Sequence, residues 1–145
     1  MVSDDNQVRF GYYHPVKLFT DIIPARFTSR PNRFVVECLV DEKAVRAYLP
    51  NPGRLWELFF PGSKLMLVKF PPATGRKLAY MVVAVERDGL PVMLHTHYNN
   101  LVARKLIEEG RIAGLEGAVI VKAEQTIGHS RFDFLLRKDN RDIVV

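Results

Sequence analysis

The sequence predicts a mixed β and α+β fold, in which a small β-barrel is followed by the first part of a second module. Short apolar runs bounded by Gly, Pro, Asn and Asp fill residues 22–96, which is typical of consecutive β-strands. The period then changes to that of a helix over residues 99–110, and strand patterns return after it. The 145 residues are 48% hydrophobic and 26% charged, so the chain has the composition of a globular protein and the size of one ordinary domain or two very small ones.

Six strands are expected in the first part of the chain. They cover residues 22–28, 34–40, 43–49, 64–70, 78–87 and 91–96. Between the third and fourth strands, Asn51-Pro52-Gly53 supplies an N-cap and a first-turn proline for a helix over residues 54–60, and Pro61-Gly62 ends it. Three strands, a helix and further strands is the order of an OB-fold. We therefore expect an OB-fold-like barrel of five or six strands over residues 22–97, preceded by an N-terminal extension, residues 1–21.

The second module is expected over residues 98–145. Its helix, residues 99–110, has apolar residues at helical spacing and Gly110 as its stop. A strand over residues 118–124 follows, and the last eighteen residues read as a hairpin: a strand over 130–137, a turn over 138–141 and the start of a strand over 142–145. The chain thus contains a helix and two to three strands of this module.

Positive charge is concentrated in the barrel. The formal net charge is +5, and residues 22–87 hold eleven Lys or Arg against five Asp or Glu, whereas residues 99–145 hold eight against seven. Arg30 and Arg33 fall in the loop after the first expected strand, and Arg76 and Lys77 in the loop after the fourth. These are the loops with which OB-folds bind oligonucleotides. Either these cations contact nucleic acid or they are ordinary solvated turn residues, and the pattern leaves both interpretations open.

The helix expected after residue 53 also has two interpretations. Free N–H groups at its N-terminus, together with Arg54, are suited to a phosphate. Alternatively the helix closes one end of the barrel with Leu55, Leu58 and Phe59, and we favour this structural role. Thr74-Gly-Arg-Lys77 is not a P-loop, because that motif requires a second glycine and a Ser or Thr after the lysine.

Compartment and redox chemistry are constrained by what the sequence lacks. The N-terminus is acidic and polar, without the features of a signal peptide, and there is no run of eighteen apolar residues. A cytoplasmic protein is therefore expected. Cys38 is the single cysteine and lies in an apolar run, so we expect a core residue and no disulfide.

Two groups of residues invite a metal or catalytic interpretation. His95 and His97 are two residues apart on an expected strand, but one pair is a weak signal and a structural role at the junction between modules is favoured. Asp133 lies among apolar residues in the last hairpin. A carboxylate there needs a partner, which from the pattern alone would be Arg131 or a backbone N–H.

Several motifs, in this order and spacing, resemble the sugar fermentation stimulation protein A (SfsA) family over residues 22–145. They are Pro50-Asn-Pro-Gly-Arg-Leu-Trp-Glu-Leu58, Val85-Glu-Arg-Asp-Gly89, His95-Thr-His97 with Asn99, Gly114-Leu-Glu-Gly117 and Ser130-Arg-Phe-Asp-Phe-Leu-Leu136. The resemblance implies an OB-fold-like domain followed by a restriction-endonuclease-like core of the PD-(D/E)-x-K type. It also implies non-specific DNA binding and a regulatory role in sugar, notably maltose, metabolism.

The resemblance gives Asp133 a catalytic and metal-binding role, as the first carboxylate that coordinates the metal. The family's Glu-x-Lys is expected on the next strand, which ends here at Val145. Glu116, just before the first core strand, is a candidate further acidic member, although the resemblance does not align it to a ligand position. A phosphodiester-cleaving core needs at least two carboxylates to hold Mg²⁺ or Mn²⁺. We therefore expect no cleavage by these 145 residues and no certain cofactor. A nuclease is the alternative function for a chain that continues, and an incomplete second domain would leave an edge for self-association.

The sequence therefore predicts a DNA-binding protein. Its expected phosphate contacts come from basic side chains of the barrel: Arg30, Arg33, Arg54, Arg76 and Lys77.

Overall fold

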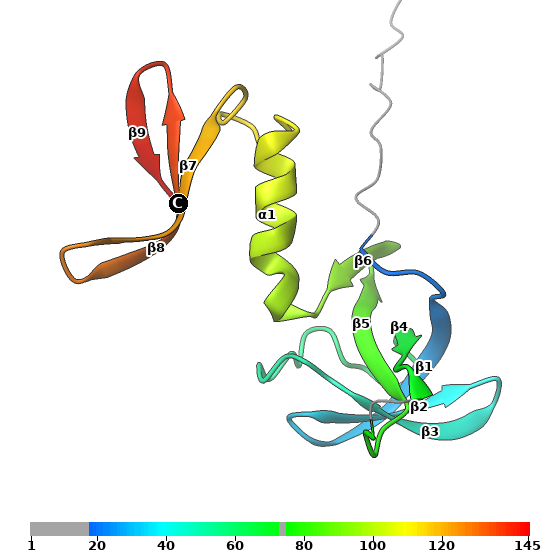
Figure 1. Ribbon diagram of the computed structural model, residues 1–145. Helices are drawn as coiled ribbons and strands as arrows, with labels where there is room; N and C mark the ends of the chain where they lie inside the picture. Colours follow the sequence, from blue (N-terminus) through cyan, green and yellow to red (C-terminus); the bar gives the residue numbers. More distant parts are fainter. Residues whose placement is uncertain (1–17, 73–74) are drawn as a thin grey trace, which may run out of the picture.

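The computed structural model describes residues 18–72 and 75–145, so most of the expected N-terminal extension lies outside the described residues. A barrel forms the first part, and helix α1 lies between it and a separate three-stranded sheet (Figure 1). The first sheet contains β1 (Ile23–Asn32), β2 (Val35–Val40), β3 (Lys43–Tyr48), β4 (Lys64–Lys69), β5 (Tyr80–Arg87) and β6 (Leu90–Met93). The second part contains a short 3-10 helix η2 (Thr96–Tyr98), α1 (Asn99–Glu108), β7 (Val119–Ile127), β8 (Ser130–Lys138) and β9 (Arg141–Val144).

The first sheet closes on itself. Its strand order is β3-β2-β1-β4-β5-β6, and the end of β3 also pairs in parallel with the start of β5, through Ala47 with Tyr80 and Tyr48 with Met81. All its other strand pairs are antiparallel. The expected OB-fold-like barrel is therefore confirmed: five strands close it, and β6 continues the sheet beyond β5.

The barrel interior follows from alternation along its strands. In β1, Ala25 and Phe27 are buried, whereas Arg26 between them and Thr28 after them are exposed, as a strand with one face toward a core requires. Leu49, Leu65 and Leu67 are at most 1% exposed. Burying one such leucine contributes about 1.5–3 kcal/mol. Cys38 is 1% exposed in the same core, which confirms its expected place.

The helix expected over residues 54–60 does not form, and that prediction was wrong. Leu55 has φ +56°, which a right-handed helix cannot accommodate, and only one turn follows, in which the N–H groups of Leu58 and Phe59 donate to the Leu55 carbonyl at 3.0 and 3.1 Å. Packing explains the difference: Leu55, Leu58 and Phe59 lie against the barrel core, and so short a segment has little helical stability of its own. Their expected role in closing the barrel is confirmed without the helix.

The loop expected over residues 29–33 is shorter than predicted. β1 continues to Asn32, which pairs with Val35, so that only Arg33 and Phe34 form the turn. Arg30 therefore projects from a strand and not from a loop.

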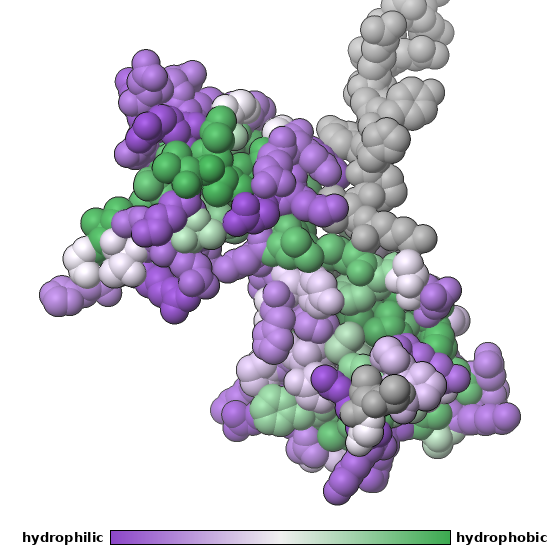
Figure 2. Space-filling view, viewed as in Figure 1, coloured by the Kyte–Doolittle hydropathy of each residue, from purple (hydrophilic) through white to green (hydrophobic). Residues whose placement is uncertain are grey.

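The second part has its own small core of Ile107, Ala118, Phe134 and Leu136. The helix, two strands and start of a third that the sequence predicts are present, with strand order β7-β8-β9. Val119 and Ile127, both on β7, are 65% and 52% exposed. In the space-filling view apolar side chains lie on the face between α1 and this sheet (Figure 2). Across the described ranges, no helix combines the length and apolar character needed to cross a membrane.

Candidate nucleic-acid interface

The five expected DNA-binding cations lie on segments that surround the end of β3. Tyr48, near that end, pairs on one side with Val35, directly after the β1–β2 turn that holds Arg33. On the other side it pairs with Met81, at the start of β5 and just after the connection that holds Arg76 and Lys77. The chain that leaves β3 reaches Arg54 six residues later. Strand pairing therefore brings both basic segments to the same strand end.

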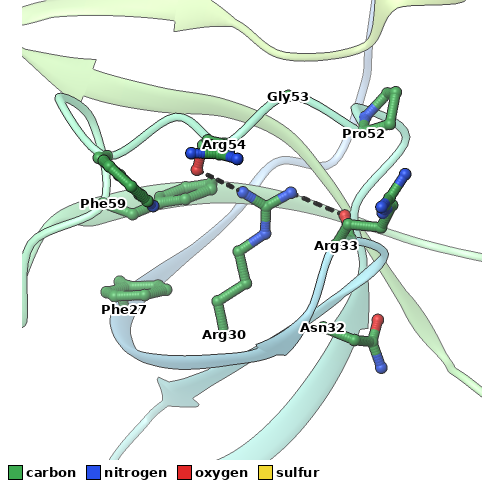
Figure 3. Close-up of a pocket in the computed structure, with 9 residues that line it drawn as sticks. Phe27, Arg30, Asn32, Arg33, Pro52, Gly53, Arg54 and Phe59 are labelled. Carbon is green, nitrogen blue, oxygen red and sulfur yellow. Dashed lines mark hydrogen bonds between the residues drawn. The ribbon is translucent and has the colours of Figure 1, made fainter.

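Arg30 holds this region together. Its Nη1 donates to the Arg54 carbonyl at 2.6 Å, and its Nη2 donates to the carbonyls of Arg33 and Asn51 at 2.8 and 3.2 Å. Figure 3 shows its guanidinium between the backbone of Arg33 and that of Arg54. Burial, and then the charge of Arg33, lower the pKa of Arg30, although arginine keeps its charge at any physiological pH. Arg30 thus joins the β1–β2 turn to the connection after β3 and leaves a net positive charge between them.

A hollow of about 640 Å³ opens beside Arg30. Three arginines line it, Arg30, Arg33 and Arg54, and no acidic residue is among the described residues of its lining. Its aromatic side chains are Trp56, Phe27 and Phe59, the last two stacked at 5.0 Å with 11° between their planes. The result is a cationic rim over aromatic rings, which is the composition of sites that bind nucleic acid through phosphates and bases.

Arg76 and Lys77 line a second, separate hollow, of about 240 Å³, together with Tyr48, Phe70 and Leu78. The Arg76 guanidinium carbon lies 4.3 Å from the centroid of the Phe70 ring, and the ring centroids of Phe70 and Tyr48 are 6.5 Å apart. Tyr48 is the last residue of β3, so this second hollow lies beside the end of that strand. The residues that follow β3 line the first hollow.

Contacts between the cations and aromatic rings were not predicted from the sequence. Arg54 lies over Trp56, with its guanidinium carbon 5.2 Å from the ring centroid, and Arg30 lies 5.5 Å from that of Phe59. A signal was present, because Arg54 and Trp56 are two residues apart. The expected helix was assigned a packing role through Leu55, Leu58 and Phe59, and Trp56 was given no role beside Arg54.

Asp133 lies outside this region, on β8, and its side chain is exposed. Its Oδ1 accepts a 3.1 Å hydrogen bond from Nδ2 of Asn100, at the start of α1, and its backbone N–H donates to the Val145 carbonyl at 2.8 Å. Arg131 pairs instead with Glu124 at 3.0 Å, so it is not the partner expected for Asp133.

The described residues supply little for a metal ion. They contain no group of three or more His, Cys, Asp and Glu side chains suited to hold one. The Glu116 carboxylate accepts from the Gly114 N–H at 3.0 Å and lies 3.6 Å from Nζ of Lys138. The hydrogen bond from its own backbone N–H, and then those of Gly114 and Lys138, lower the pKa of Glu116. Glu116 therefore has a structural role in the turn before β7.

The two histidines lie at the junction between the two parts, but not on one strand as expected. His95 precedes η2 and is 8% exposed, whereas His97 belongs to η2 and is exposed. Their ring centroids are 5.6 Å apart, and His95 packs edge-on against Tyr98 at 4.4 Å. Thr96 between them donates to the Pro50 carbonyl at 3.1 Å, which ties the junction to the barrel.

Comparison with known proteins gives two family matches. Residues 28–94 match the family described as the SfsA N-terminal OB domain, and residues 97–145 match the sugar fermentation stimulation protein RE domain.

Curated relatives include sugar fermentation stimulation protein homologs of Methanothermobacter thermautotrophicus, 36% identical, and Methanosphaera stadtmanae, 37% identical. These alignments cover 82% and 81% of this chain but 49% and 50% of the relatives. The chain therefore spans about half the length of the curated relatives it matches.

A solved structure, that of Pyrococcus furiosus SfsA in complex with Ca²⁺, is also similar. It is 30% identical, with a TM-score of 0.65, over 87% of this chain and 53% of that one.

Proposed function

The chain belongs to the sugar fermentation stimulation protein family, and from that premise we propose that it binds DNA without sequence preference through the basic end of its barrel. The observation that supports this most is the grouping of Arg30, Arg33 and Arg54 around one hollow, where no acid is among the described lining residues. A phosphate oxygen is the ligand that such a group of guanidinium ions attracts most strongly.

The absence of sequence preference follows from where the cations lie. Arg33, Arg54, Arg76 and Lys77 are in turns and connections, and such side chains reach phosphate and sugar more readily than base edges in the major groove. Phosphate contacts fix the position of a duplex without reading its sequence. Arg30 adds charge, but its main contribution is to hold Arg33 and Arg54 in place.

Salt dependence tests this proposal. Binding of a labelled duplex, measured by anisotropy from low to moderate salt, should weaken steeply as counterions return to the DNA. Arg33→Ala and Arg54→Ala should each lower the slope by about one, and so should Arg76→Ala and Lys77→Ala.

Lys122→Ala and Arg141→Ala, in the second sheet, are the matched charge controls and should leave the slope unchanged. A slope near zero in the unmodified chain would exclude phosphate contacts as the source of binding. Equal losses in both groups of variants would mean that net charge, and not the barrel end, is responsible.

A role in regulating sugar metabolism is part of the proposal and is supported by the names of the relatives alone. The expected cytoplasmic location is compatible with DNA binding and stays a prediction.

A metal-dependent nuclease is the alternative function, for a chain that continues past Val145. The relative from Pyrococcus furiosus was solved with Ca²⁺, and Asp133 presents an exposed carboxylate on β8. Calcium takes six to eight oxygen ligands, whereas among the described residues the Asp133 side chain has a hydrogen-bond donor, the Asn100 amide, beside it and no cluster of further ligands. The described residues therefore do not fit a metal centre. Asp133→Asn should leave duplex binding by these residues unchanged.

A further inference from the structure

Trp56 is the most exposed large hydrophobic side chain in the part of the chain that the structure describes, with 71% of it accessible. A single exposed apolar residue needs no explanation by itself. Trp56, however, lines the same hollow as Arg30, Arg33 and Arg54, in a segment that Arg30 fixes to the barrel through the carbonyls of Asn51 and Arg54. The indole is therefore presented from a held backbone, at the edge of a cationic site.

The charges around this hollow remain available. Arg33 and Arg54 are exposed, and the ion pairs of the described residues engage neither of them. Arg54 lies over one face of the Trp56 ring at 5.2 Å, which leaves the opposite face for another planar group. Figure 3 shows Arg33, Pro52 and Arg54 around the Arg30 guanidinium, with Phe27 and Phe59 to one side.

These features define what the hollow would recognise. An open indole face attracts a planar aromatic group, and the neighbouring guanidinium ions attract a phosphate. An unpaired nucleotide carries both groups, and the hollow, at about 640 Å³, lies within the size range of small-molecule sites. The bases of a duplex are stacked on one another, so their faces are not accessible to the indole.

We propose that this hollow binds an unpaired nucleotide of single-stranded DNA, whose base stacks on Trp56 and whose phosphate lies against Arg33 and Arg54. This inference rests on the proposed DNA binding and adds a second mode to it: duplex is held by phosphate contacts alone, and a single strand by phosphate contacts and stacking.

Intrinsic fluorescence tests the stacking directly, because Trp56 is the only tryptophan in the sequence. Adding an oligothymidine of about 15 nucleotides, within the range of OB-fold site sizes, should quench the Trp56 emission, and the duplex of equal length should not. In anisotropy measurements with labelled DNA, Trp56→Ala should weaken single-strand binding roughly 5- to 150-fold and leave duplex binding unchanged. Trp56→Phe should restore part of the loss.

Leu90→Ala is the matched control, because Leu90 is a similarly exposed apolar residue, 69% accessible, on β6. It should change neither type of binding. The stacking site would be overturned if oligothymidine did not quench the emission and Trp56→Ala bound single strands as tightly as the unmodified chain. If the duplex still bound, the proposed function would remain intact. Absence of binding to both forms of DNA would overturn both. Quenching by oligouridine but not by oligothymidine would overturn the assignment to DNA.

Discussion

Nη1 of Arg30 donates a 2.6 Å hydrogen bond to the backbone carbonyl of Arg54, so that one arginine of the site positions another. The same guanidinium reaches the carbonyls of Arg33 and Asn51. The rigid fork of arginine makes this arrangement available, because several donors lie in one plane. Replacing Arg30 should therefore lower the stability of the fold as well as remove a positive charge.

Arg30→Ala should lower the free energy of unfolding by about 1–3 kcal/mol, because three carbonyls lose their donor. Arg30→Lys should recover little, since one ammonium cannot reproduce the fork. Urea denaturation measures both. Arg26→Ala is the control: Arg26 lies on the same strand and pairs at the surface with Glu42, an interaction worth about 0–1 kcal/mol. Equal effects at the two positions would contradict the bridging role of Arg30.

Cys38 should be unreactive while the protein is folded. Its thiol is 1% exposed, and burial raises its pKa to about 11, so little thiolate exists at neutral pH and reagents cannot reach it. A chromogenic disulfide reagent at pH 8 should react slowly with the native chain and rapidly in denaturing urea. A fast native reaction would show that β2 opens locally.

His95 should make stability depend on pH. Burial and the neighbouring His97 lower its pKa from the ordinary 6.5, so the unfolded chain takes up a proton that the folded chain resists. Stability from this residue is fully present above about pH 6.5 and is lost as the pH falls toward the lower folded pKa. Urea unfolding at successive pH values measures the free energy of unfolding. His95→Gln should make its decrease toward low pH less steep, whereas His129→Gln, in an exposed turn, should not. An unchanged slope in His95→Gln would assign the pH dependence elsewhere.

The turn between β8 and β9 should tolerate glycine and reject valine. Asp139 and Asn140 have φ values of +48° and +59°, as the two central residues of a type I′ hairpin turn require. Asn140→Gly should leave thermal stability unchanged or slightly higher, and Asn140→Val should lower it by about 1–2 kcal/mol. Ser130→Val, at an exposed position on β8, is the control and should cost little, because strands favour β-branched residues. Equal tolerance at both positions would mean that the turn rearranges.

Strands were predictable where apolar and polar residues alternate clearly along the sequence. The inward residues Ala25 and Phe27 mark β1, but the alternation fades after Thr28, so its continuation to Asn32 was not predicted. The segment after residue 53 was misassigned for a different reason. Its capping pattern favours a helix, whereas contact of Leu55, Leu58 and Phe59 with the barrel requires another backbone path. In this segment, tertiary packing overrides the local helix propensity.

The candidate site was predictable in its charges and not in its geometry. Arg33 and Arg76 could be named because they lie in expected turns, and Arg54 because it lies at the start of an expected helix. That Arg30 joins Asn51 and Arg54, 21 and 24 residues away, depends on how the strands pair. The same holds for Asp133, whose partner Asn100 is 33 residues away on α1. Such contacts have no local pattern in the sequence.

The parallel pairing of Ala47 and Tyr48 with Tyr80 and Met81 also constrains the order of folding. It joins strands that are separated by a long connection, so its loop-closure entropy must be overcome before the contacts form, and it should be among the last pairings to appear. Arg54, Trp56, Phe70 and Arg76 all lie within that connection. A chain that has not yet closed its barrel therefore has no assembled binding surface, and the ability to bind DNA should appear during refolding together with the final closure step.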